Sequence, residues 1–152
     1  MPTRFLIALL AALALLSTGC GGGDGGDRPT LEEYEAAVNN TRDRVDFALA
    51  RITKAESQEE VLDRMDEAAV SIDAAASDLE DEGSPEEFDE ETEKLTTSLH
   101  QLSTDLEAVS HDVRNQIVEA PKALNFESWD QANLALAALI GDGLDVKLIE
   151  RH

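Results

Sequence analysis

The chain has 152 residues, of which 33 are acidic and 12 are basic, and its formal net charge at pH 7 is −21. This strong negative charge argues against nucleic acid as a partner, because binding it requires basic patches that release counterions. Anionic membrane surfaces should repel the chain as well. Aromatic residues make up only 4% of the sequence, so the core of a folded domain must come mainly from Leu, Val, Ile and Ala.

An uninterrupted apolar run lies close to the start of the chain. After Arg4, residues 5–16 (FLIALLAALALL) are all apolar. A membrane-spanning helix needs about 20 such residues, whereas a shorter run behind a basic residue is typical of a secretory signal peptide. Small residues at 17–19 suit cleavage by a peptidase. The alternative, a buried core helix, would have little to pack on because a glycine run follows.

Cys20 is the only cysteine, so it cannot form an internal disulfide. No histidine or acidic cluster surrounds it, as a metal or catalytic site would need. The stretch LLSTGC, residues 15–20, resembles the lipobox of bacterial lipoproteins, with Ser17 where that motif usually has Leu. The resemblance implies a diacylglycerol on the Cys20 thiol and cleavage between Gly19 and Cys20. It also implies a protein anchored to a cell membrane, facing the extracytoplasmic side.

The residues after Cys20 are typical of a tether. The stretch GGGDGGDRP, residues 21–29, is rich in glycine and should behave as a flexible coil with a span of roughly 15–18 Å. We therefore divide the chain into a signal peptide (1–19), a lipidated cysteine with its tether (20–29) and a folded domain (30–152). Cleavage removes only Arg4 among the charged residues.

The folded domain has the apolar period of helices and no alternating strand pattern. Helices are predicted at about 30–54, 57–82, 85–120 and 128–140. Short loops make the first three antiparallel neighbours, so the expected fold is all-α: an antiparallel bundle of three long helices with a short fourth. The predicted core positions follow 3-4 spacing and are Leu31, Tyr34, Val38, Thr41, Val45, Ala48 and Ile52; Val61, Met65, Ala68, Ile72, Ala75 and Leu79; Phe88, Thr92, Leu95, Leu99, Leu102, Leu106, Val109, Val113 and Ile117; and Leu134, Ala137, Ala138 and Ile140.

Capping residues mark the helix ends. The first, second and fourth helices begin with side chains that can accept hydrogen bonds from free backbone N–H groups. The third helix begins with a Ser-Pro pair. Glycine or proline can end the helices. The start signals are Thr30 to Glu33, Ser57 to Glu60, Ser84-Pro85 and Ser128 to Gln131; the stop signals are Gly83, Pro121, and Gly141 or Gly143.

Helix lengths predict how the bundle is arranged. The third helix, about 36 residues or roughly 54 Å long, should overhang the other two, and the fourth should fold back on that overhang. The tether and the loop between helices two and three should then share one end, with helix four at the far end. The tail after residue 143 should dock as an extended segment.

Two groups of residues are candidate metal ligands. Residues 78–93 carry ten acidic side chains and no basic one, which suits either a weak Ca²⁺ or Mg²⁺ site or a solvated acidic tip; no calcium-loop spacing occurs there. His100 and His111 share one helix face but lie about 16 Å apart along it, too far for one ion. Neither group predicts a metal site, and no cofactor is expected.

The candidate partner-binding residues are Phe126 and Trp129, in NFESWDQAN (125–133). Trp is enriched at binding hot spots, although both rings could instead seal the end of the bundle. No Ser or Cys stands in a catalytic pattern with His, so no enzyme is expected. Three functions remain: a lipid-anchored module that binds an envelope protein or wall component, a small-ligand or cation binder, and an acidic spacer without a partner.

Overall fold

The computed structural model describes residues 28–115 and 126–150. The predicted signal peptide, Gly19, Cys20 and most of the tether lie outside these residues, and so do Ile117 and Pro121. Within the described ranges, none of the helices combines the length and the apolar character that crossing a membrane requires.

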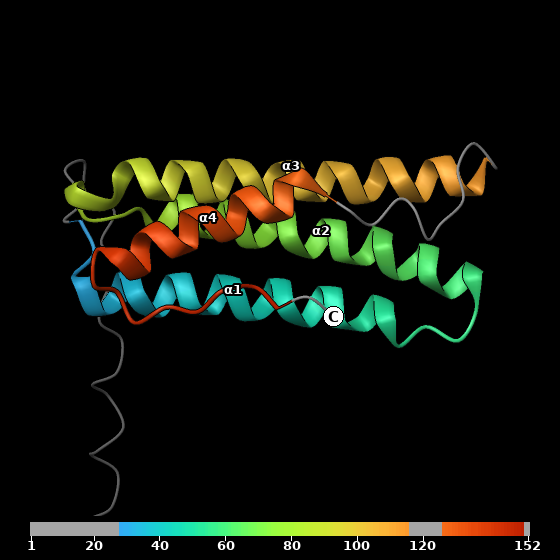
Figure 1. Cartoon of the computed structure of the whole chain (residues 1–152), viewed down its shortest axis with the longest axis horizontal. Helices are drawn as coiled ribbons and strands as arrows, with labels where there is room; N and C mark the ends of the chain where they lie inside the picture. The colour runs from blue at the N-terminus through green and yellow to red at the C-terminus, as the bar shows by residue number, and fades with distance from the viewer. Residues whose placement is uncertain (1–27, 116–125, 151–152) are drawn as a thin grey trace, which may run out of the picture.

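Three long helices and a shorter fourth make up the structure, which confirms the predicted all-α bundle. They are α1 (Leu31–Thr53), α2 (Gln58–Glu82), α3 (Asp89–Arg114) and α4 (Glu127–Gly141), and a short 3-10 turn, η1 (Glu86–Phe88), precedes α3. The first three helices form a layer with α2 in the middle, packed against both neighbours, and α4 lies across α3 on one face of this layer (Figure 1).

The core of the layer follows the predicted 3-4 spacing in the three long helices. Nearly all predicted positions are buried there, with Leu31 exposed and Val61 and Val109 only partly buried. The buried residues of α2 include four alanines: Ala68, Ala69, Ala75 and Ala76. Three buried hydroxyls donate hydrogen bonds to backbone carbonyls of α2: Thr41 to Ala75, Ser103 to Ala69 and Ser110 to Leu62.

The first two predicted caps form. Thr30 accepts from the Glu33 N–H while Glu33 accepts from the Thr30 N–H, which makes the capping box that begins α1. Ser57 caps α2, and Gly83 ends it with a φ of 75°, a conformation that glycine adopts without strain. The cap predicted at Ser84 is wrong: its hydroxyl donates to the Asp89 carboxylate at 2.6 Å, and η1 begins without a side-chain cap.

An aromatic pair joins the start of α1 to η1. The rings of Tyr34 and Phe88 are stacked with centroids 5.5 Å apart, and the Tyr34 hydroxyl lies 2.6 Å from the Thr92 hydroxyl. Arg28, within the predicted tether, donates to the Asp89 carboxylate at 2.7 Å. The start of α1 and the loop between α2 and α3 therefore share one end of the bundle, as predicted.

The expected overhang of the third helix is absent from the described residues. α3 has 26 residues and α2 has 25. At the end of α3, Arg114 forms salt bridges with Asp63 and Asp66, close to the start of α2. The predicted continuation to residue 120 lies outside the described ranges.

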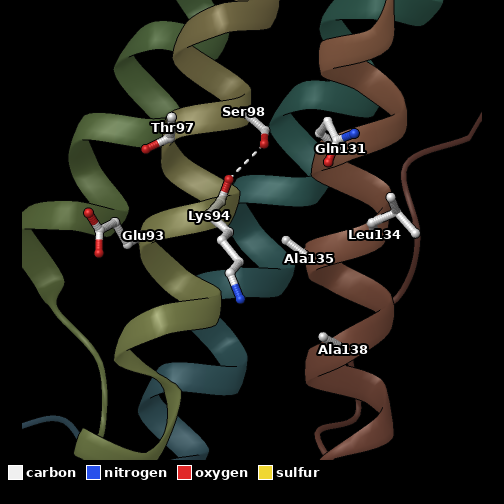
Figure 2. A pocket seen from close by; sticks show the side chains of 8 residues that line it. All are labelled: Glu93, Lys94, Thr97, Ser98, Gln131, Leu134, Ala135 and Ala138. Carbon is white, nitrogen blue, oxygen red and sulfur yellow. Dashed lines mark hydrogen bonds between the residues drawn. The ribbon is translucent and has the colours of Figure 1, made fainter.

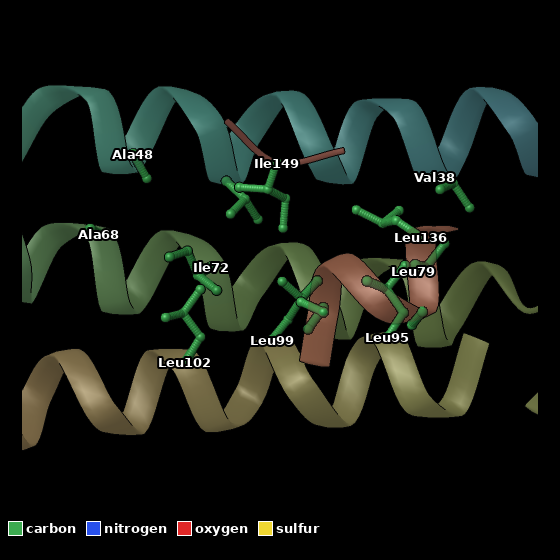
Figure 3. Close-up of a cluster of buried hydrophobic side chains, with 14 of the residues drawn as sticks. Val38, Ala48, Ala68, Ile72, Leu79, Leu95, Leu99, Leu102, Leu136 and Ile149 are labelled. Carbon is green, nitrogen blue, oxygen red and sulfur yellow. The ribbon is translucent and has the colours of Figure 1, made fainter. Parts of the chain in front are cut away.

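The predicted position of helix four at the far end is wrong. α4 runs back along α3 toward the start of α1 (Figure 1). Its buried side chains belong to the same core as those of the three-helix layer, and Leu136 lies close to Val38 and Leu79 (Figure 3). This shared core explains the position, because a short apolar helix is most stable where it covers apolar surface.

The chain beyond α4 docks as an extended segment, as predicted, and is here called the strap (residues 144–150); it runs along α1 (Figure 1). Gly143, with a φ of 100°, ends α4. The Gly143 N–H donates to the Ile140 carbonyl and the Leu144 N–H donates to the Leu139 carbonyl, which is the Schellman pattern. This turn sends the strap back over the core.

Candidate interaction surface on α4

The face of α4 predicted to be buried is the exposed one. Ala132, Ala135, Leu136 and Leu139 face the core, whereas Leu134 is 62% exposed and Ile140 is 40% exposed. The other two predicted core positions, Ala137 and Ala138, are exposed as well. Residues 131–141 carry no charged side chain, so α4 is apolar on nearly all sides. Periodicity therefore could not identify its buried face.

The start of α4 also differs from the prediction. The helix begins at Glu127 after Phe126, and no side chain caps it. Ser128, predicted as the cap, is buried, and its hydroxyl donates to the Asp105 carboxylate of α3. Asp105 also accepts from Gln101 at 2.9 Å. This polar contact fixes the first turn of α4 to the middle of α3.

A shallow groove of about 460 Å³ separates the outer faces of α3 and α4. Figure 2 shows the residues on its two sides, with the Lys94 side chain extending between the helices. Its lining combines polar side chains of α3 with mainly apolar ones of α4: Glu93, Lys94, Thr97 and Ser98 from α3, and Gln131, Leu134, Ala135 and Ala138 from α4.

The positive charge in the groove is already paired. Lys94 donates to the Glu90 carboxylate at 2.6 Å, and Glu91 lies 3.9 Å away. The hydrogen bond to Glu90 raises the pKa of Lys94 and lowers the pKa of Glu90. Lys94 is therefore protonated at neutral pH but adds no unpaired positive charge, and the groove keeps the acidic surroundings of the chain.

Phe126 and Trp129 lie at the start of α4, half-buried and packed against the core. They lie beside Ser128, which contacts the middle of α3 through Asp105, and so they are not at the far end of the bundle. Neither residue lines the groove. Their role in binding a partner stays a prediction, and the exposed apolar surface lies further along α4.

The acidic segment 78–93 contacts basic side chains that its own sequence does not contain. Arg28 pairs with Asp89, Arg44 with Asp78, and His100 lies 3.4 Å from Glu80. These basic side chains come from other parts of the chain, so a linear reading finds only the acids. Across residues 28–115 and 126–150, no group of three or more His, Cys, Asp or Glu side chains could hold a metal ion.

His100 and His111, the histidines within the described ranges, do not share a site. The Nδ1 atom of His100 lies 2.7 Å from the Asp73 carboxylate, across the contact between α2 and α3. His111 contacts Asp112 and Asn115, close to the end of its own helix. His152 lies outside the described residues.

Comparisons with protein-family models, with curated proteins and with solved structures found no match to this chain.

Proposed function

We propose that this protein is a lipid-anchored lipoprotein of a bacterial envelope, whose helical bundle is an interaction module that binds an envelope protein through α4. The anchor is proposed on the resemblance of residues 15–20 to a lipobox. One observation carries the binding role. The outer face of α4 is uncharged and presents Leu134 and Ile140 to solvent on a chain with a formal charge of −21.

Charge and shape indicate the kind of partner. Apolar side chains can cover Leu134, Ala137 and Ala138 of α4. Acidic side chains such as Glu93 line the other side of the groove, and they favour basic residues on the partner. The partner surface should therefore combine apolar residues with Lys or Arg. A group of neighbouring exposed apolar side chains is more typical of an interaction site than of a spacer.

The geometry favours a protein over a small ligand. Small-molecule sites enclose most of their ligand, whereas this groove is shallow and has the exposed Leu134 side chain on its edge. With the anchor on Cys20, the end of the bundle that holds Arg28 lies nearest the membrane. The groove, beside Lys94 in the first turns of α3, then faces partners close to the membrane surface.

Photo-crosslinking in the native envelope tests this function. A photoreactive amino acid replaces Leu134 in one variant and Leu31 in the other. Leu31 of α1 is the matched control, because it is also an exposed leucine but lies outside the groove. We expect a discrete adduct from position 134 alone. Absence of an adduct at 134, or equal adducts from both positions, would contradict binding through α4.

A further inference from the structure

A second exposed apolar patch lies on α1 and α2, outside the groove. Phe47 of α1 is 68% exposed and Val70 of α2 is 67% exposed, the two highest values among the large apolar side chains of the described residues. Ala74 of α2 is exposed as well. Single exposed apolar side chains are common, but a group of them on neighbouring helices marks an interaction surface.

Two salt bridges join α1 to α2 on either side of this group: Arg44 with Asp78, and Arg51 with Glu67. Phe47 comes between the two arginines along α1, and Val70 and Ala74 come between the two acids along α2. Steps of three and four residues keep each set on one side of its helix. The two helices are antiparallel neighbours in the layer (Figure 1). The three apolar side chains therefore lie at one level, between the salt bridges.

The charges around the apolar group are divided between the two helices. We call the whole surface the Phe47 patch; it consists of Arg44, Phe47 and Arg51 of α1 and Glu67, Val70, Ala74 and Asp78 of α2. Its two basic side chains balance its two acidic ones, although the chain as a whole has a formal charge of −21. The α1 half of the patch is positive and the α2 half is negative. Such a surface is complementary to a second copy of itself.

We propose that the Phe47 patch is the interface of a parallel homodimer, in which α1 of each copy packs over α2 of the other. A two-fold axis along the helices produces this arrangement. Phe47 of each copy then packs on Val70 of the other copy, and each arginine faces an acidic side chain. A two-fold axis across the helices would instead stack α1 on α1 and place Arg51 over Arg44 of the other copy.

The size of this face suits a dimer. α1 has 23 residues and α2 has 25, so each helix is roughly 35 Å long and two side by side are about 20 Å wide. Their outer face can therefore bury about 700 Å² per copy, close to the roughly 800 Å² per partner of a stable interface. The parallel arrangement also places both starts of α1 at one end, so two lipid-anchored copies can share one membrane.

Light scattering of the protein purified in detergent tests the association. We expect a dimer, and Phe47→Glu should raise its dissociation constant at least tenfold, because it places a charge at the centre of the interface. The circular dichroism spectrum should not change, since Phe47 is exposed in the single copy. Leu134→Glu is the matched control and should leave the dimer intact, because Leu134 lies on α4. A native protein that stays monomeric up to about 0.1 mM, or equal effects of the two substitutions, would overturn the proposal.

A charge exchange tests the parallel arrangement. The double substitution Arg51→Glu with Glu67→Arg keeps the salt bridge within each copy but reverses its direction. Native and exchanged proteins should each form their own dimers, because opposite charges still meet across each interface. A mixed dimer would place arginine over arginine and glutamate over glutamate, so it should form at least tenfold more weakly.

Energy transfer between copies that carry donor and acceptor labels measures this choice of partner. Neither measurement uses an envelope protein or requires the lipid, so their outcomes are independent of the proposed binding through Leu134. Self-pairing of native with native and of exchanged with exchanged protein supports the parallel dimer. Mixed dimers that form as readily as unmixed ones, or in preference to them as an antiparallel stack of α1 on α1 requires, would contradict it.

Discussion

Asn133 binds both backbone groups of Ile149. The Ile149 N–H donates to the Oδ1 atom of Asn133 at 2.8 Å, and the Nδ2 atom of Asn133 donates to the Ile149 carbonyl at 3.2 Å. A single side chain on a helix thus pairs with the strap as a residue of an antiparallel strand would. This pairing ties the end of the described chain to α4, and the buried Ile149 side chain adds to the core.

Asn133→Ala should lower the free energy of unfolding by about 1–3 kcal/mol, because it leaves a partly buried N–H and carbonyl without these bonds. Urea unfolding followed by circular dichroism measures the change. Asn40→Ala, on the exposed side of α1, is the control and should change stability by less than about 0.5 kcal/mol. Equal effects of the two substitutions would show that Asn133 does not hold the strap.

Two glycines at the end of α4 should respond to alanine with opposite sign. Gly143 has a φ of 100°, where a side chain strains the backbone, so Gly143→Ala should destabilise the protein by roughly 1–2 kcal/mol. Gly141 is helical with no atom within 4 Å of an added Cβ, so Gly141→Ala should stabilise it by up to about 1 kcal/mol. Thermal unfolding measures both, and a shift of the same sign in both variants would contradict the observed end of α4.

Two leucines on α4 test which face is buried. Leu136 is 1% exposed and Leu134 is 62% exposed. Leu136→Ala should cost about 2–5 kcal/mol of folding stability, because it removes core contacts and leaves a cavity. Leu134→Ala should cost less than about 0.5 kcal/mol. Chemical unfolding measures the stability loss of each variant. A larger loss for Leu134→Ala than for Leu136→Ala would contradict the observed orientation of α4 and support the face that periodicity predicted.

Tyr34 should make the fold sensitive to alkaline pH. Burial raises the pKa of its hydroxyl, although the hydrogen bond with Thr92 opposes the shift. Because the folded pKa lies above the unfolded value of about 10, the unfolded chain loses its proton first. The contribution of Tyr34 to stability is therefore complete below pH 10 and is lost as pH rises through the folded pKa.

Absorbance of the phenolate can follow this titration without interference from other tyrosines, because Tyr34 is the only one in the chain. In thermal unfolding above pH 10, Tyr34→Phe should reduce the loss of stability. The same substitution should cost about 0.5–1.5 kcal/mol at neutral pH, through the lost hydrogen bond. A pKa of Tyr34 in the folded protein that is no higher than the unfolded value of about 10 would contradict this prediction.

The three long helices could be predicted because charged residues flank a single apolar stripe on each. Tyr34, Ile72 and Leu99 are all buried where the 3-4 spacing placed them. α4 could not be oriented in the same way, because Leu134 and Leu136 lie in a stretch that is apolar throughout. Its buried face was determined by the apolar surface of the layer beside it, which no local pattern encodes.

Several side-chain hydrogen bonds also could not be predicted from the sequence. Ser128 matched the pattern of a helix cap, but its hydroxyl binds Asp105 of α3. Ser84 likewise binds Asp89 instead of capping a helix. In both cases a carboxylate from a neighbouring turn or helix competes for the hydroxyl with the free N–H groups of the helix end. The side chains that hold the strap escaped prediction for the same reason, since Asn133 and Arg42 bind it together only in the folded chain.

The proposed lipid attachment at Cys20 would determine where the bundle acts, and the intact mass of the protein purified from a bacterial membrane tests it most directly. We predict a chain that begins at Cys20, lacks residues 1–19 and carries the added mass of a diacylglycerol. Cys20→Ser should remain uncut and carry no lipid. A mature chain with a free Cys20 thiol, or one cut at another position, would contradict the lipid-anchored protein proposed here.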